Sequence, residues 1–304
     1  MAYTVGDLQE NSANYKFVYP NTLFLLNTET NQQTEIFSLD VTTELEYVHR
    51  LVDLAFSRDG KQLAFSTTNN VYLHSLETNT TESLFGATTS KQVKNTAGSP
   101  IYGYSGMSFS PTDTHLYVRR GFYEGMEPVV VSMETKAEVS VPLADELGGY
   151  GGYILDWYDE NSLVAVKDLD AEPGFSTTAL LQLSILDQNF KQIATVHQNH
   201  ALYGGYQMGA LQLFAVPYTL QEGEETSEIL WLTVDAQEPS GLKQIASFKN
   251  EPGVGAEMFE MLDENIVLLQ AFDPSLSYGK LYTFNKATNK LQLVADDARL
   301  SNWK

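Results

Sequence analysis

A polar turn of similar composition recurs six times along this chain, and it constrains the fold more than any other feature. Each copy sets Asn, Asp, Glu, Gln, Ser or Thr between two short apolar runs, which is typical of a turn joining two β-strands. The copies are centred on Thr28, Thr78, Thr135, Gln188, Gln237 and Thr288, so successive turns are 50, 57, 53, 49 and 51 residues apart. This period over 304 residues indicates a repeat architecture with six units.

A second hairpin pattern precedes several of these turns and identifies the repeat unit. Segments 54–67, 107–120, 155–168 and 259–272 each predict a strand, a tight turn with Asp or Asn, and another strand. Two hairpins in each period make a four-stranded blade. We therefore expect an all-β, six-bladed β-propeller in a single domain, with blades at 14–38 plus 297–304, 48–86, 104–142, 151–196, 204–249 and 256–295.

The two ends of the chain are expected to meet in one blade. The first repeat predicts three strands and lacks an inner strand of its own. The segment 297–304 resembles the inner strands of the other blades, since Leu300 and Trp303 align with Leu155 and Trp157 to within one residue. We expect this C-terminal strand to join the N-terminal blade and close the ring, which leaves no open sheet edge.

The segment FSRDGKQLAFST (56–67) and its looser copy FSPTDTHLYV (109–118) resemble the WD40-like repeat of the TolB-type six-bladed propellers. The pattern extends over about four of the repeats. The resemblance implies the fold much more than the function, because propellers host many unrelated roles. It also implies an extracytoplasmic protein, periplasmic or secreted, whose mature chain lacks a signal peptide.

Charge and composition exclude several classes of function. The chain has 18 Lys and Arg against 39 Asp and Glu, and its formal charge of −21 repels nucleic acid and anionic lipid. It has no stretch of ~18 consecutive apolar residues, the length of a membrane-spanning helix. Without cysteine it forms neither disulfides nor thiolate metal sites. We expect a monomer with no nucleic acid partner and no direct membrane insertion, whose partner is a protein, peptide or small ligand.

A Tyr/Gly motif that recurs before the inner strands of three successive blades is the candidate ligand site. The copies IYGYSG, GGYGGY and LYGGYQMG contribute Tyr102, Tyr104, Tyr150, Tyr153, Tyr203 and Tyr206. They fall in expected long loops, among them 86–106, 143–152 and 197–209, on the face where propellers bind ligands. Tyrosine offers a rigid ring and a hydroxyl, and flanking glycines permit close approach. We predict a Tyr-lined channel mouth; the alternative is that the rings pack between blades.

Two arginines complete the predicted ligand site. Arg50 leads into the second blade, and Arg119 and Arg120 end a strand of the third. Alternation sends adjacent side chains to opposite faces, so only one of that pair faces the site, and we assign Arg120. A guanidinium can hold a carboxylate or phosphate with two hydrogen bonds. The alternative is an ordinary surface ion pair.

Metal binding has weak support in the sequence. Two acidic segments offer the oxygen ligands that calcium prefers, but neither has EF-hand spacing; they contain Asp168, Asp170 and Glu172, and Glu222, Glu224 and Glu225. His197 and His200 follow a strand instead of sharing a helix face, which disfavours zinc. We expect no cofactor and no metal, with calcium as the cation that these acids would take.

We favour a non-catalytic binding module and expect no enzyme, because the sequence has no nucleophile elbow, phosphate-binding loop or nucleotide fingerprint. The alternative is a cation-dependent hydrolase or lactonase-like enzyme, which requires acids converging on the channel. The inner strands offer Asp53, Asp156 and Glu260 for that role. A third reading is a structural spacer without a ligand.

Overall fold

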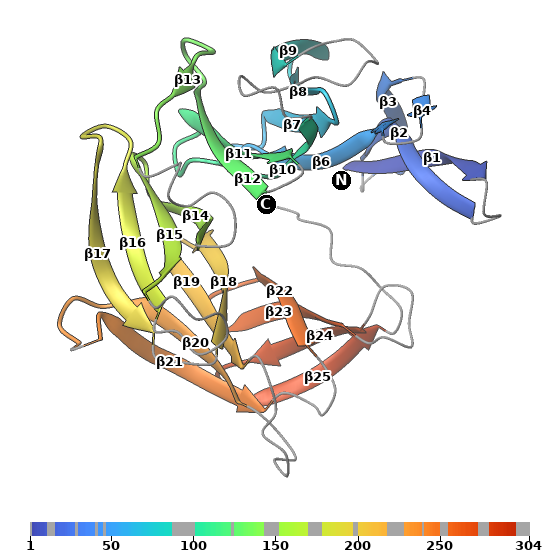
Figure 1. The fold of residues 1–304 in the computed structure, drawn as a ribbon. Coiled ribbons are helices and arrows are strands. Elements are labelled where there is room, and N and C mark those ends of the chain that lie inside the picture. Colours follow the sequence, from blue (N-terminus) through green and yellow to red (C-terminus); the bar gives the residue numbers. More distant parts are fainter. Residues whose placement is uncertain are drawn as a thin grey trace. The chain divides into compact units, whose positions relative to one another are not determined.

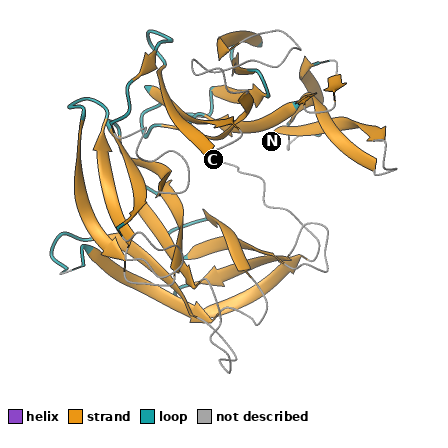
Figure 2. Cartoon of the chain, viewed as in Figure 1, coloured by secondary structure: helices purple, strands orange, loops and turns teal. Residues whose placement is uncertain are grey.

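The computed structural model describes residues 2–10, 16–27, 30–39, 42–44, 47–86, 101–122, 125–142, 152–169, 178–196, 200–217, 228–238, 240–249, 255–272 and 280–295. All regular structure in these ranges is β-strand (Figure 2). No helix in this part of the chain is long and apolar enough to cross a bilayer. The chain divides into two compact units, residues 1–139 with residue 304, and residues 140–303.

Unit 1 contains an N-terminal sheet, a short ribbon and two four-stranded sheets, all antiparallel (Figure 1). The N-terminal sheet is β1 (Ala2–Glu10), β2 (Lys16–Leu26) and β3 (Gln33–Ser38), and the ribbon is β4 (Thr42–Glu44) and β5 (Tyr47–His49). The first four-stranded sheet is β6 (Leu51–Phe56), β7 (Gln62–Thr67), β8 (Asn70–Ser75) and β9 (Thr80–Gly86). The second is β10 (Ile101–Phe109), β11 (His115–Phe122), β12 (Gly125–Ser132) and β13 (Glu138–Val139).

Unit 2 contains three more four-stranded sheets of the same topology. The first is β14 (Gly152–Asp159), β15 (Ser162–Asp168), β16 (Thr178–Ser184) and β17 (Asn189–Val196). The second is β18 (His200–Gln207), β19 (Ala210–Pro217), β20 (Glu228–Val234) and β21 (Leu242–Lys249). The third is β22 (Gly255–Met261), β23 (Ile266–Phe272), β24 (Lys280–Asn285) and β25 (Lys290–Ala295). In every sheet the strands pair in sequence order, as in propeller blades.

The all-β propeller architecture is confirmed, but the expected number of blades is wrong. The described residues form five four-stranded blades and one three-stranded N-terminal sheet instead of six blades. The first repeat was expected to contain three strands and contains two, β2 and β3; the third strand of its sheet is Ala2–Glu10, which pairs with β2 along nine residues. The closing strand predicted at 297–304, with Leu300 and Trp303, lies outside the described residues.

The six polar turns lie between the last two strands of each sheet, and local chemistry explains them. In each, the side chain of a Ser, Asn or Asp accepts a hydrogen bond from a backbone N–H two or three residues ahead; these residues are Asn27, Ser75, Ser132, Ser184, Asp235 and Asn285. The turn then passes through a left-handed residue, which is Asn31, Asn79, Lys136, Gln188, Gly241 or Asn289. Asn and Gly tolerate this conformation best, and they occupy four of these six positions.

Aromatic side chains fill the space between neighbouring sheets within each unit. In unit 1, Phe37 of β3 contacts Phe65 of β7 with ring centroids 4.8 Å apart. In unit 2, Phe214 of β19 stacks on Phe259 of β22 at 4.2 Å, and Phe248 of β21 stacks on Phe284 of β24 at 4.2 Å. Within each unit, the cores therefore lie between sheets and hold neighbouring sheets together.

The left-handed turn of the β8–β9 hairpin makes a specific stability prediction. Asn79 has φ of 52°, so Asn79→Ala should lower the free energy of unfolding by about 1 kcal/mol, whereas Asn79→Gly should change it by less than about 0.5 kcal/mol. Urea unfolding of both variants measures the difference. Asn189→Ala, an exposed Asn without positive φ, is the control and should be nearly neutral. Equal losses for Asn79→Ala and Asn79→Gly would contradict the conformational explanation.

Candidate functional site

The first strand of each blade is an edge strand of its sheet, and its free backbone amides need partners from elsewhere. In unit 1 that partner is Asp53 on β6. Its Oδ2 accepts hydrogen bonds from the N–H groups of Gly106 at 2.6 Å and Met107 at 3.3 Å on β10. Its Oδ1 accepts one from Leu54 N–H at 2.8 Å. The carboxylate therefore joins the inner strands of two blades.

The same arrangement recurs twice in unit 2. Asp156 of β14 is fully buried, and its Oδ2 accepts a hydrogen bond from Tyr206 N–H of β18 at 2.9 Å. Gln207 of β18 accepts from Met261 N–H of β22 at 2.7 Å and donates to Phe259 O at 3.2 Å. In each case a polar side chain on one inner strand holds the backbone of the next.

These contacts bear on the acids that the enzyme alternative requires. Asp53 and Asp156 are engaged with backbone amides of neighbouring blades, and Glu260 is half-buried on β22. Among the described residues, no three His, Asp or Glu side chains lie close enough together to hold a metal ion. The acidic segments fall largely outside this part of the chain: the side chain of Asp168, and all of Asp170, Glu172, Glu222, Glu224 and Glu225, are not described.

Loops were expected at the Tyr/Gly motifs, but the first motif (101–106) lies within β10 and most of the third (202–207) lies within β18; of the second motif only Gly152 and Tyr153 are described, at the start of β14. Tyr104 is buried and meets Phe85 edge-on at 5.4 Å. The Tyr153 hydroxyl donates to Leu202 O at 3.0 Å, and the Tyr203 ring lies 5.9 Å from that of Phe259. These are contacts between blades. Tyr206 is half-buried, while Tyr150 and the side chain of Tyr102 lie outside the described set, so ligand binding by the six tyrosines stays a prediction.

The arginines occupy different environments. Arg120 forms ion pairs with Glu127 at 3.2 Å and Glu138 at 2.6 Å, and its guanidinium lies 5.9 Å from the centre of the Tyr104 ring. Burial alone would lower the pKa of Arg120, but the two glutamates and the Tyr104 phenol outweigh burial and raise it. The Arg50 side chain is half-buried at the start of β6.

A hollow floored by glycine lies at one end of the β10–β12 sheet in unit 1. Gly103 is directly opposite Gly121, and Phe122 is opposite Gly125, so two neighbouring cross-strand pairs lack one or both side chains. The resulting cavity has a volume of ≈ 370 Å³. Its lining consists of Val52, Gly103, Ser105, Gly121, Phe122, Gly125 and Met126. Gly103 and Ser105 of the first Tyr/Gly motif are part of this lining, and the lining surface is mostly apolar.

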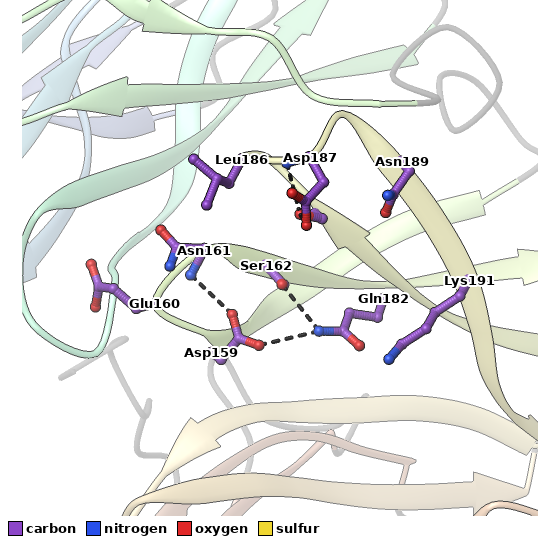
Figure 3. Close-up of a pocket in the computed structure, with 10 residues that line it drawn as sticks. Asp159, Glu160, Asn161, Ser162, Gln182, Leu186, Asp187, Asn189 and Lys191 are labelled. Carbon is purple, nitrogen blue, oxygen red and sulfur yellow. Dashed lines mark hydrogen bonds between the residues drawn. The ribbon is translucent and has the colours of Figure 1, made fainter.

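A second cavity, in unit 2, was not found by sequence reasoning. It has a volume of ≈ 410 Å³ and lies between the β14–β15 turn and the β16–β17 turn of one blade (Figure 3). Its lining is polar: Asp159, Glu160, Asn161, Ser162, Gln182, Ser184, Leu186, Asp187, Asn189 and Lys191. The two turns were identified separately as connections between strands, and nothing in their sequences indicates that they meet across a shared space.

Comparisons with known proteins identify the fold. No protein-family model and no curated protein matches the sequence. Similar solved structures include the β-propeller domain of the Trilobed protease from Pyrococcus furiosus (TM-score 0.60, 14% identity, covering 97% of this chain and 79% of that one). Others are an oligogalacturonate lyase from Vibrio parahaemolyticus (0.53, 17%, 96% and 74%) and a putative TolB from Agrobacterium tumefaciens (0.53, 10%, 92% and 90%). At these identities the likeness supports the β-propeller fold, with TolB-like proteins among its neighbours, and leaves the function undetermined.

Asp53 predicts a specific pH dependence of stability. Burial raises the pKa of its carboxyl above 3.8, although the amides of Leu54, Met107 and Gly106 and the charge of Arg119 act in the opposite direction. A raised pKa in the folded state means that the contribution of Asp53 to stability is greatest at acidic pH and falls as pH rises. The stability of the wild type relative to Asp53→Asn should therefore decrease as the pH rises above about 4, the ordinary pKa of an Asp carboxyl in the unfolded chain.

Urea unfolding of the two proteins over a series of pH values measures the effect. Subtracting one free energy of unfolding from the other at each pH removes the pH dependence that all other acids contribute. Arg119→Met should make the dependence on pH steeper, because it removes a charge that favours the ionised carboxylate. If the wild type instead gains stability over Asp53→Asn as pH rises, the amide bonds and Arg119 outweigh burial.

Proposed function

We propose that this chain is a non-catalytic propeller binding module that takes its ligand at the glycine-floored hollow of unit 1. The observation that carries the proposal is the pairing of Gly103 with Gly121, which leaves bare backbone between the side chains of Val52, Phe122 and Met126. A volume of ≈ 370 Å³ falls within the range of small-ligand sites. Met126 at the rim is 44% exposed, so the site is open to a partner.

The lining favours an apolar group of a peptide or protein as the ligand. Among the described residues, the lining of the hollow includes no charged side chain, and Ser105 contributes its one hydroxyl. Burying an apolar side chain there removes its surface and that of Phe122 and Met126 from water. Because Gly103 and Gly121 have no side chains, such a group can approach the sheet closely.

The ligand contacts predicted from the sequence are retained as a separate proposal, made of Tyr102, Tyr104, Arg50 and Arg120 in unit 1 and of Tyr150, Tyr153, Tyr203 and Tyr206 in unit 2. We further propose a monomer in an extracytoplasmic compartment that binds neither nucleic acid nor membranes. The charge of −21 supports the exclusion of these anionic partners. Fractionation of native cells tests the location, and sedimentation of the purified chain tests the monomer.

Filling the hollow tests the binding site. Gly121→Val is suitable because an added Cβ would lie 3.6 Å from Gly103 O, an ordinary contact, and Gly121 has no positive φ. Peptides selected from a random display library on the wild-type chain should share an apolar anchor residue. They should bind Gly121→Val at least about tenfold more weakly, as measured by fluorescence anisotropy.

Gln244→Val is the matched control, because it adds the same side chain at an exposed strand position of unit 2. It should bind the selected peptides like the wild type. Circular dichroism and thermal unfolding establish that both variants are folded. Equal binding by wild type and Gly121→Val would exclude the hollow as the site.

Calorimetry with calcium separates the binding module from the cation-dependent enzyme, because only the enzyme requires a bound cation. Because Asp53 and Asp156 are engaged with backbone amides, we expect no saturable binding of calcium at millimolar concentration. Asp53→Asn should then give the same baseline as the wild type. Saturable calcium binding that Asp53→Asn abolishes would favour the enzyme over the binding module.

A further inference from the structure

Two exposed apolar side chains lie on neighbouring turns of unit 2. Met208, on the β18–β19 turn, is 58% exposed, and Leu262, on the β22–β23 turn, is 53% exposed. Each directly follows one partner of a hydrogen bond between the two blades, from Met261 N–H to Gln207 Oε1 at 2.7 Å. This bond joins the ends of β18 and β22, so the turns that carry Met208 and Leu262 are held next to each other.

The backbone at Met208 is unfavourable for its own side chain. Its φ is 52° and that of Gly209 is 80°, and a two-residue turn with positive φ at both positions prefers Asn followed by Gly. Among the seven described residues other than glycine that have positive φ, Met208 is the one with an apolar side chain. An Asn would relieve the strain and remove the apolar surface from water. A strained residue that does not serve its own turn favours a role outside the fold.

The turn that carries Leu262 is fixed by its own hydrogen bonds. Leu262 N–H donates to Ile266 O at 2.9 Å, and Asp263 Oδ1 accepts from the N–H groups of Asn265 at 2.7 Å and Ile266 at 2.8 Å. The preceding residue, Met261, is buried in the core, while Leu262 faces solvent. Because this turn is already ordered, little backbone freedom is lost when a partner binds it.

The charged side chains beside this apolar pair are acidic. The turns between the first and second strands of the three blades of unit 2 contain, among the described residues, no Lys or Arg and three acids: Glu160, Asp263 and Glu264. The described bases at this end of the blades belong to the third and fourth strands and their turns; they are Lys191, Lys243, Lys286 and Lys290. An apolar pair bordered by carboxylates is complementary to a basic partner, and it disfavours a second copy of this chain, whose charge is −21.

We propose that Met208 and Leu262 form a second docking surface, on unit 2, for a basic segment of a protein partner in which an apolar residue is flanked by Lys or Arg. The apolar residue of the partner packs against both side chains and removes their surface from water. The flexible thioether of Met208 adapts to the shape of that residue. The flanking bases pair with the carboxylates of Asp263 and Glu264, which directly follow Leu262 in the chain.

Peptide selection with counter-selection tests the chemistry of this surface. Peptides from a random display library are selected on the wild-type chain and depleted on a double variant, Met208→Asn with Leu262→Gln. The recovered peptides should contain an apolar residue flanked by Lys or Arg, and their affinity for the wild type should fall as salt is raised. Recovery of no peptide that distinguishes the two proteins, or of peptides without basic residues, would overturn the proposal.

Single variants and two controls locate the binding. Met208→Asn and Leu262→Gln should each bind the recovered peptides at least about tenfold more weakly than the wild type, as measured by fluorescence anisotropy. Leu293→Gln changes an exposed leucine of β25 in the same way and should bind like the wild type. Gly121→Val, which fills the hollow of unit 1, should also bind like the wild type, so the two surfaces can fail independently. Wild-type affinity in either Met208→Asn or Leu262→Gln would refute the assignment.

Thermal unfolding of Met208→Asn separates a docking role from a structural one. Because Asn suits positive φ, this variant should unfold at the same or a higher temperature than the wild type while it loses the peptides. A lower unfolding temperature would mean that Met208 serves the fold, and it would overturn the proposal. Glu264→Gln should weaken peptide binding about threefold, since it removes one bordering charge, and unchanged affinity would exclude the pairing with bases.

Sedimentation of the purified wild type tests a second copy of the chain as the occupant. The wild type should remain monomeric over the accessible range of concentrations, because like charges border the surface on each copy. Self-association that Met208→Asn abolishes would overturn the assignment to a basic partner and identify the second copy instead.

Discussion

The structure depends on how its edge strands obtain hydrogen-bond partners. The first strand of each four-stranded blade has a free edge, and its amides are polar groups that must be paired when neighbouring sheets bury them. Asp53, Asp156 and Gln207 each supply the acceptor from the preceding blade. Stacked aromatic rings, such as Phe214 on Phe259, join the same two blades that Gln207 links by its hydrogen bonds. Polar bonds near the inner strands and apolar contacts farther out thus act on the same pairs of blades.

This arrangement explains why the acidic residues of the inner strands were ambiguous in the sequence. An Asp on an inner strand suits a metal site and suits equally the capture of a backbone amide, and the residue type alone does not separate the two. The decisive information is the position of Gly106 and Met107, which are more than fifty residues away from Asp53 in the chain. Burial of the Asp53 carboxyl raises its pKa, which is the electrostatic consequence of using a charged group for this contact.

Features encoded within a few residues were predictable, and those requiring distant partners were not. The Asn79 turn was visible because a left-handed residue and a Ser or Asn cap are local requirements. The strand Ala2–Glu10 was missed because Gly6 and Asp7 interrupt its apolar residues, so its pairing with β2 is what defines it. The first and third Tyr/Gly motifs were assigned to loops although they lie largely in β10 and β18, since glycine in an edge strand resembles a loop. The cavity around Gln182 required two turns to meet, which no single segment indicates.

Certain glycines of this fold have little freedom to change for a steric reason. A Cβ on Gly241, in the β20–β21 turn, would lie 2.2 Å from the backbone oxygen of Ile193 in the neighbouring blade, and one on Gly204 would lie 2.1 Å from the oxygen of Gln212. Both residues also have positive φ, so a side chain is disfavoured by conformation as well as by space. A side chain at either position would force the backbone of a neighbouring strand or blade to move, whereas a change at an exposed residue of an outer strand meets no such obstacle. The spacing between adjacent strands and blades at these points is therefore set by the absence of a single carbon atom.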